Sequence, residues 1–460
     1  MNALFLARVK KVPVVIVEQQ AAVGGLYTSV STPFGLVDQG VHIPQQTGIL
    51  AFDELFFDAI PRDDWQILEG VRKDIAGNFF AGRIDCGSIY PNLRRLPPED
   101  FQQCVTEILA NASTSYPTFE ASNTLKDYME ARFGSACTRI VFEPISQKIW
   151  KQPLDAMSPW AAKLVHLTRV ITHDMEEAQT LKSSPALDAI IGFPDQFSVP
   201  SEVFSNQRRA LYPKQFGLKG VVDGLVRELE REGVQLLTSS NVEGIDVDAG
   251  SLSAIHLRNL QTATTERLEA SSIVWCSPLP PLGKLLGVQG SSLPDISLSH
   301  RVVHLFLDQP PETGALYWLW SYDPDNCLVR VSSPHAYCSD AVKNGVHQLC
   351  VEIHVPDKEI HDEDAIDLAQ FQLRACKLIA PKTRVLGGTV IKAIKSFMVP
   401  TVANLQAMQS QRRSIESAKP RNLVIASPDL SAGVFYMPDI LRTGMPKLDD
   451  LVTNHVSNTA

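Results

Sequence analysis

Two features near the start of the chain are of the kind that hold a nucleotide. Glu18 directly follows the apolar run 14–17, and Gly24 and Gly25 come shortly after it. In dinucleotide-binding folds, an acid at the end of a buried parallel strand accepts hydrogen bonds from the ribose hydroxyls. Paired glycines let the backbone pass close to a bulky cofactor because they carry no Cβ. The alternative explanation for Glu18 is a solvent-exposed acid at a strand end.

An aromatic face is predicted farther along the chain. Trp318, Trp320 and Tyr322 alternate in sequence, so on a strand they lie on the same side. The next strand-like run, 328–332, carries Arg330. Such a face suits a planar or sugar-like anion, whose carboxylate or phosphate Arg330 would bind through two hydrogen bonds. The alternative is a half-buried sheet that packs on helices, with Arg330 in solvent at its edge.

Other chemistries lack a motif in this sequence. His300 and His304 lie in the β-rich run 300–307, where their spacing along a strand is too wide for both to bind one metal ion. We therefore expect no metal site. The chain contains no G-x-S-x-G nucleophile turn and no G-x-x-x-x-G-K-[ST] phosphate loop. Hydrolase and P-loop kinase functions thus have no support.

Composition and charge exclude several classes of partner. The 460 residues carry a net charge of −9, and no run of Lys or Arg is longer than a pair, which argues against nucleic acid. No segment offers the roughly 20 apolar residues of an integral membrane segment. The eight cysteines are scattered without a C-x-x-C pair and are expected to be reduced thiols. Because no export signal is recognisable, we expect a cytoplasmic protein, and the oligomeric state stays open.

The elements that would position these residues are those of an α/β protein. The run 3–11 favours a helix and is followed by the strand 14–18, as in the second half of a βαβ unit, so the first strand and its loop are expected to precede residue 1. Apolar residues at helical spacing predict an amphipathic helix over 218–229. Strands are expected at 234–237, 242–247, 252–257, 272–276 and 422–426. The segment 61–200 is predicted to be mainly helical, 301–355 to be rich in strands, and 438–442 to open a final helix.

Glu18, the Gly24–Gly25 pair and the turn 34–42 with Gly40 and His42 resemble the opening of the two-dinucleotide-binding flavoproteins. This superfamily contains amine oxidases, protoporphyrinogen oxidase, phytoene desaturases and UDP-galactopyranose mutase. Three later segments, 211–242, 272–278 and 422–444, fit the same pattern in order. The resemblance implies a Rossmann-like FAD-binding domain interleaved with an α+β substrate domain that carries an antiparallel sheet, with FAD as the cofactor.

The resemblance also implies how the chain is divided. The FAD-binding domain would comprise three parts, with a mainly helical substrate or cap region and a substrate-domain antiparallel sheet inserted between them. The FAD-binding parts would be 1–60, 205–290 and 391–460, the helical region 61–204 and the sheet 291–390.

By the same resemblance, His42 lies beside the flavin and Val242 contacts the adenine, while Gly444 belongs to the final helix that caps the flavin. Asp429 would stand in for the acid of a Gly-Asp pair that usually ends the last strand. Lys214 would contact pyrophosphate or substrate, or would be an ordinary surface lysine. With Glu18 and the glycine pair, His42, Val242, Asp429 and Gly444 form the predicted cofactor site. Lys214 is grouped with the residues of the aromatic face as a predicted substrate-binding residue.

The favoured function is an FAD-dependent oxidoreductase that acts on a small organic substrate by hydride transfer to the flavin. Because such chemistry needs few catalytic side chains, no catalytic residue is singled out. One alternative is a flavin-dependent non-redox mutase similar to UDP-galactopyranose mutase. A second is a flavin-free protein with a binding or scaffold role, since the G-x-G-x-x-G loop that holds pyrophosphate is absent from residues 1–460. Either the start of the sequence is truncated, or no FAD is bound.

Overall fold

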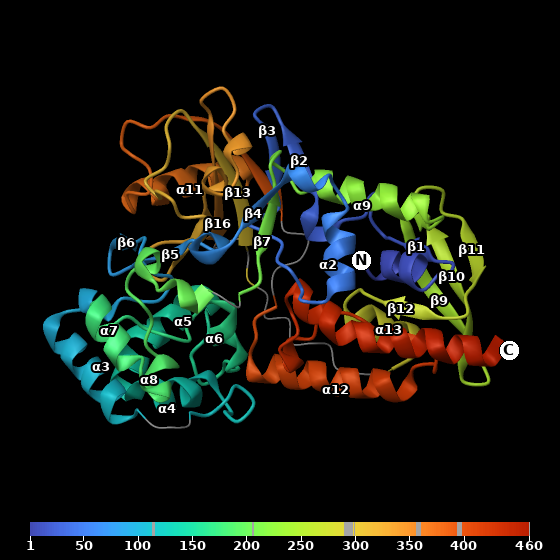
Figure 1. The fold of residues 1–460 in the computed structure, drawn as a ribbon, viewed down its shortest axis with the longest axis horizontal. Helices are drawn as coiled ribbons and strands as arrows, with labels where there is room; N and C mark the ends of the chain where they lie inside the picture. The colour runs from blue at the N-terminus through green and yellow to red at the C-terminus, as the bar shows by residue number, and fades with distance from the viewer. Residues whose placement is uncertain are drawn as a thin grey trace.

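The computed structural model describes residues 1–112, 116–204, 207–288, 298, 300–355, 360–392 and 398–459. Figure 1 shows three regions: an α/β region that contains both ends of the chain, a unit of short helices, and a large sheet. Both parallel and antiparallel strand pairs occur. The fold is therefore the mixed α/β class predicted from the sequence.

The α/β region is built on two short parallel pairs of strands. β1 (Val15–Val17) pairs with β8 (Gln235–Leu237), and β12 (Ile273–Trp275) pairs with β18 (Leu423–Ile425). These pairs confirm four of the predicted strands. An unbroken apolar, β-branched run such as 14–17 is typical of a strand buried on both faces of a parallel sheet, but Val15 is 38% exposed. The antiparallel layer that covers this face packs against Val17 at the other end of the strand and leaves Val15 open.

An antiparallel layer and several helices enclose these strands. The elements are α1 (Asn2–Leu4), a π-helical turn (Phe5–Val9), α2 (Leu50–Phe57), α9 (Lys219–Arg231), β9 (Ser240–Asp248), β10 (Ser251–Asn259), β11 (Thr265–Glu269), α10 (Leu279–Leu285), α12 (Val402–Ala418) and α13 (Met437–Thr459). The predicted helix at 218–229 is confirmed as α9, whose Val221 and Leu229 are buried. Leu4, Phe5 and Leu229 share one apolar cluster with residues of α13, so the first and last helices of the chain pack together.

The helical unit follows three strands that the sequence did not indicate. The helices are α3 (Pro98–Ala110), α4 (Leu125–Cys137), α5 (Glu143–Trp150), α6 (Trp160–Leu164), α7 (Met175–Leu181) and α8 (Pro185–Asp188). The mainly helical segment therefore begins near Pro98. Before it, β4 (Trp65–Leu68), β5 (Ala76–Phe80) and β6 (Arg83–Asp85) are strands. β5 is buried throughout, and its short run has no periodicity that separates a strand from a helix.

The large sheet has seven strands in the order β17-β13-β16-β15-β14-β5-β6. Its remaining strands are β13 (His300–Leu307), β14 (Trp318–Ser321), β15 (Leu328–Ser332), β16 (His347–His354) and β17 (Val385–Lys392), and α11 (Asp362–Ala375) packs against it. All its pairs are antiparallel except β14 with β5. The predicted antiparallel sheet is confirmed, and it also recruits two strands from the segment before α3.

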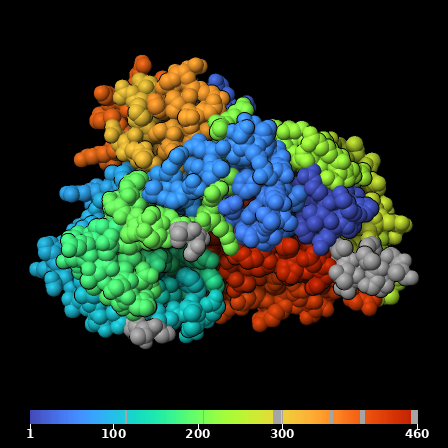
Figure 2. Space-filling view, in the orientation of Figure 1, coloured from blue at the N-terminus to red at the C-terminus, as the bar shows by residue number. Residues whose placement is uncertain are grey.

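One apolar core runs through the large sheet and the helical unit. Figure 2 shows the helical unit, in cyan and green, against α12 and α13, in red. Backbone hydrogen bonds join them where the Ser158 amide donates to the Pro400 carbonyl, 2.9 Å away. Within the described residues, no helix combines the length and the apolar character needed to cross a bilayer.

Candidate functional site

The residues predicted to bind the adenosine lie together at the carboxyl end of β1. The Glu18 carbonyl accepts a hydrogen bond from the Ser240 amide at 2.9 Å, which brings the start of β9 beside the acid. Val242, on β9, shares a small apolar cluster with Val17. One carboxyl oxygen of Glu18 accepts from the Gln20 amide at 2.7 Å, so the acid is held at the turn that leaves the strand.

The glycine pair forms an open turn beside α9. Gly24 has a φ of +124° and Gly25 a φ of +55°, both in the region that favours glycine. A Cβ on Gly24 would lie 2.9 Å from Thr28 Cγ2 and 3.0 Å from Val222 Cγ1, whereas one on Gly25 would meet nothing within 4 Å. Leu26, the next residue, is 61% exposed. The turn thus presents bare backbone and an uncovered apolar side chain to the outside.

A buried carboxylate fixes the hairpin that follows the glycine pair. The hairpin consists of β2 (Ser29–Thr32) and β3 (Gly35–Asp38), and Asp38 is 2% exposed. Its carboxyl group accepts from the Tyr212 hydroxyl at 2.5 Å, the Ser29 hydroxyl at 2.6 Å and the Leu218 amide at 3.1 Å. Tyr212 lies on β7 (Ala210–Pro213), and Leu218 directly precedes α9. Asp38 therefore ties the hairpin to β7 and α9 just before Gly40 and His42.

Beyond this hairpin, Arg330 forms a charged cluster with Glu352 on the neighbouring strand. The Arg330 Nε atom donates to Glu352 Oε1 at 2.7 Å, and His300 Nε2 lies 3.4 Å from Glu352 Oε2. Burial alone would raise the pKa of Glu352, but Arg330 and His300 lower it to about 2. The guanidinium also lies 5.5 Å from the centre of the Trp320 ring. Arg330 is thus paired within the fold and is not in solvent at a sheet edge.

Gly40 and His42 lie beside this cluster. A Cβ on Gly40 would be 3.4 Å from Glu352 Oε1, 3.9 Å from an Arg330 nitrogen and 4.0 Å from His42 Nε2. Burial, followed by the positive charge of Arg330, lowers the pKa of His42 to about 4, so its imidazole is neutral at physiological pH. The ring centre of Tyr27 is 6.1 Å from that of His42. The side chain of Tyr27, two residues after Gly25, thus reaches from the glycine turn to the histidine.

The predicted aromatic face is buried, and its polar atoms are engaged with the protein. The Trp318 indole donates to Asp74 Oδ1 at 2.8 Å, and the Trp320 indole donates to His166 Nδ1 at 3.4 Å. The Tyr322 hydroxyl lies 2.9 Å from the Val165 carbonyl and 3.2 Å from the Ile89 carbonyl, to either of which it can donate. Tyr322 therefore packs into the core of the helical unit. The two tryptophans instead support Asp74 and His166, which were not predicted.

A pocket of about 810 Å³ lies between the helical unit and the loops before and after β5 and β6. Both Asp74 and His166 line it. Its charged groups are Lys73, Asp74, Arg169, Lys182 and Asp188, three basic side chains against two acidic ones. Lys182 Nζ is 2.5 Å from Asp188 Oδ1, and Arg169 Nε donates to the Asp188 carbonyl at 3.1 Å. The pocket is therefore positively biased at the end formed by α7 and α8.

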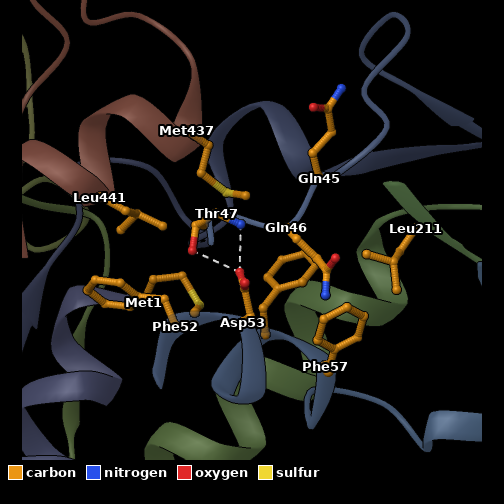
Figure 3. Close-up of a pocket in the computed structure, with 11 residues that line it drawn as sticks. Met1, Gln45, Gln46, Thr47, Phe52, Asp53, Phe57, Leu211, Met437 and Leu441 are labelled. Atoms are coloured by element: carbon orange, nitrogen blue, oxygen red, sulfur yellow. Dashed lines mark hydrogen bonds between the residues drawn. The ribbon is translucent and has the colours of Figure 1, made fainter. Parts of the chain in front are cut away.

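A second cavity, of about 10 Å³, lies between α2 and the start of α13 (Figure 3). Asp53 is its one acidic side chain, and Oδ1 of that carboxyl accepts from the Thr47 amide at 2.6 Å and the Thr47 hydroxyl at 2.8 Å. Met437 and Leu441 of α13 approach from the other side. This cavity is small, and its acid binds the loop that precedes α2, so it belongs to the packing of α2 on α13.

Three predicted site residues lie elsewhere or have partners within the chain. Lys214 is exposed at the end of β7, and its amide donates to the Asp64 carbonyl at 2.7 Å. Asp429 accepts from Arg412 at 2.8 Å and from the Ser431 hydroxyl at 2.5 Å. Gly444 is buried in α13, where a Cβ would lie 3.5 Å from Ala426 Cβ. Their predicted contacts with cofactor or substrate stay predictions.

The carboxyl ends of the parallel strands offer polar groups that no other residue satisfies. The Ser427 hydroxyl, two residues beyond β18, is buried without a hydrogen-bond partner among the described residues, and so is Asn2 Oδ1. The Asn2 amide nitrogen lies 3.6 Å from Cys276 Sγ, one residue beyond β12. Ligands of open parallel sheets bind outside these strand ends. Together with Glu18 and the glycine turn, the unsatisfied atoms fit a dinucleotide such as FAD.

Comparisons with known proteins agree with this geometry. No protein-family model matches the chain, and neither does any curated protein. A structure of reduced UDP-galactopyranose mutase is similar over 100% of this chain and 93% of its own, with a TM-score of 0.70 and 16% identity. The structure of a putative protoporphyrinogen oxidase from Exiguobacterium sp. 255-15 is similar over 98% of this chain and 96% of its own, with a TM-score of 0.64 and 14% identity.

A third solved structure, wild-type putrescine oxidase bound to putrescine, covers 98% of this chain and 96% of its own, with a TM-score of 0.59 and 12% identity. The likeness covers at least 98% of this chain in each case, while the identities are low enough to show the fold alone. The chain has the fold of the FAD-dependent, amine oxidase-like flavoproteins.

Proposed function

We propose that this protein is an FAD-dependent oxidoreductase that acts on a small organic substrate. The observation that carries the proposal is the order of the features that follow β1: Glu18 lies beside the start of β9, the open glycine turn comes next, and the ring centre of Tyr27 is 6.1 Å from that of His42, beside Arg330. Arg330 lies 5.5 Å from the centre of the Trp320 ring, and the Trp320 indole donates to His166, which lines the 810 Å³ pocket. A dinucleotide that reached a substrate in that pocket would follow the same path.

The residues along this path have distinct tasks in this proposal. When bound, FAD supplies an acceptor for a hydride from the substrate. Glu18 would accept hydrogen bonds from the ribose, and Gly24 and Gly25 would leave room for the cofactor. His42 is neutral and lies beside the ion pair of Arg330 with Glu352, so the protein places a group that can donate or accept a hydrogen bond next to this fixed dipole. Fixed dipoles aimed at the reacting atoms stabilise charge that develops there.

The pocket favours an anionic substrate. Lys182 and Asp188 form an ion pair in which the two charges cancel, which leaves the basic Lys73 and Arg169 against the acidic Asp74. A cation such as putrescine would meet the wrong sign of charge at this end. This observation also supports a second function, a flavin-dependent mutase that acts on a sugar nucleotide, because such a substrate carries phosphates.

An anaerobic assay separates the possibilities. The protein is loaded with FAD, a panel of hydroxy acids, amino acids and amines is added, and the visible absorption of the oxidised flavin is followed. Loss of the absorption on adding an electron-donating substrate supports the oxidoreductase, and the anionic members should react first. Isomerisation of UDP-galactopyranose only after chemical reduction of the flavin, with no net consumption of electrons, would replace it with the mutase. Failure to retain FAD would contradict both functions.

A further inference from the structure

The backbone at His166 is in an unusual conformation. Its φ of +57° lies in the left-handed region, which costs a residue with a Cβ roughly 1 kcal/mol or more. The residue is in the turn between α6 and the strand-like segment at 170, and this conformation turns the imidazole toward β14. Its ring centre is 5.3 Å from that of Trp318. Strain of this kind persists only where the surrounding structure over-determines the conformation.

The hydrogen bond from Trp320 determines where the His166 ring carries its proton. An indole nitrogen can only donate, so His166 Nδ1, which is 3.4 Å from it, must accept and be unprotonated. The proton of the neutral ring is therefore on Nε2. Burial, and then the charge of Arg330, lower the pKa of His166 to about 4, which keeps the ring neutral at physiological pH. Because His166 lines the large pocket and is only half-buried, this Nε2–H is available to a ligand.

Asp74 is the counterpart of His166 in the same wall. Its Oδ1 accepts from the Trp318 indole, and the ring of that indole also contacts the ring of His166, so the two polar groups share one neighbour. Asp74 is exposed to the pocket, which leaves its Oδ2 accessible. The pocket wall therefore combines a hydrogen-bond donor, His166 Nε2–H, with a hydrogen-bond acceptor, the carboxyl group of Asp74.

We propose that His166 Nε2–H and Asp74 Oδ2 form a subsite that binds a substrate hydroxyl group, and that Trp320 is the positioning residue that fixes the tautomer of His166. The hydroxyl oxygen accepts from His166, and its hydrogen is donated to Asp74. An ammonium group cannot accept from His166, and a carboxylate cannot donate to Asp74. The subsite thus selects an alcohol, while the basic end of the pocket takes the anionic part of the same molecule. This inference rests on the proposed function, in which the 810 Å³ pocket holds the substrate.

Nitrogen NMR of the histidines tests the tautomer without any cofactor or activity. In protein labelled with 15N-histidine, the His166 signals are those that disappear in His166→Phe, and His173→Phe, which changes a histidine outside the pocket, is the matched control. We expect His166 to be protonated on Nε2 and unprotonated on Nδ1 at neutral pH. In Trp320→Phe, which removes the indole N–H, the two tautomers should interconvert and their signals should average. A ring protonated on Nδ1 or on both nitrogens in the unmutated protein overturns the proposal.

Three probes that share a benzyl or phenyl group test the selectivity: benzyl alcohol, benzylamine and benzoate. Benzyl alcohol should shift the His166 Nε2 signal most, because it alone completes both hydrogen bonds. Its apparent affinity should fall about fivefold in Trp320→Phe, the effect of weakening one hydrogen bond. Equal shifts with all three probes would overturn the hydroxyl subsite. Since none of these measurements requires FAD, they can fail while the proposed flavin chemistry stands, and the reverse also holds.

Discussion

The ion pair between Arg330 and Glu352 depends on pH in a predictable direction. The folded protein lowers the pKa of Glu352 from 4.5 to about 2, so the charged carboxylate stabilises the fold above pH 4.5 and this contribution is lost as the pH falls toward 2. Glu352→Gln should lower the free energy of unfolding by about 3 kcal/mol at neutral pH, because it leaves Arg330 without its charged partner. Urea denaturation at several pH values measures both effects.

The difference in the free energy of unfolding between Glu352→Gln and the unmutated protein should become smaller at acidic pH, because the unmutated protein then loses the same negative charge. Glu269→Gln is the control, because Glu269 pairs with Arg267 at 3.4 Å but its side chain is 87% exposed. Such exposed pairs contribute less than about 1 kcal/mol. If this difference in the free energy of unfolding is the same at neutral and acidic pH, Glu352 stabilises the fold through its packing and not through its charge.

The two adjacent glycines before Tyr27 should respond differently to the same substitution. In Gly24→Ala, the new Cβ would contact Thr28 and Val222 at 3.0 Å or less, and a φ of +124° is unfavourable for alanine. We expect a loss of about 3 kcal/mol in the free energy of unfolding. Gly25→Ala has a φ of +55° and open space around the Cβ, so it should lose only about 1 kcal/mol. Similar losses for both variants would contradict the close packing of Gly24 on α9.

At the scale of elements, α9 carries a matched pair of glycines. A Cβ on Gly224 would lie only 1.7 Å from the Ala59 carbonyl oxygen, so Gly224→Ala must displace the helix from the segment after α2 and should cost about 3 kcal/mol. Gly220→Ala, on the same helix with nothing within 4 Å, should stabilise the protein by about 0.5 kcal/mol. Thermal denaturation compares them, and a tolerated Gly224→Ala would show that the helix can move away from Ala59 without loss.

The elements that the sequence predicts are those with a strong local signal. α9 has an apolar stripe, and β12 and β18 are short β-branched runs bounded by turns. β4 and β5 were missed because pairing with distant segments, β7 and β14, decides their conformation, and β6 is a three-residue edge strand that pairs with β5. Short apolar runs of this kind do not distinguish a strand from a helix.

The candidate site was predicted only in part, for a similar reason. Glu18 and the glycine pair follow a strand in sequence, so their proximity is local. His42 and Arg330 come from distant segments, and sequence alone does not show that each lies about 4 Å from the position of a Cβ on Gly40. No sequence motif indicated Asp74 or His166 as site residues. Each accepts a hydrogen bond from a tryptophan of β14, and only the fold brings that tryptophan near.

At the scale of the whole molecule, Glu18 should matter for cofactor affinity and not for stability. Glu18→Ala removes an acceptor for ribose hydroxyls, which should weaken FAD binding about tenfold, or about 1.4 kcal/mol. Glu243→Ala is the control, since Glu243 is an exposed acid next to Val242 on β9 and pairs with Arg258 at 3.5 Å. Equilibrium dialysis against FAD compares the two variants. Equal affinities would remove Glu18 from the proposed cofactor site.

The central claim is that the α/β region of this chain holds a flavin dinucleotide. Calorimetric titration of the purified protein with FAD tests it most directly, with AMP as a second ligand for the adenosine end alone. We expect saturable binding of one FAD per chain, with AMP competing weakly for the same site. Absence of any heat or retained flavin at saturating FAD would contradict the claim, and the oxidoreductase and mutase proposals would both fall with it.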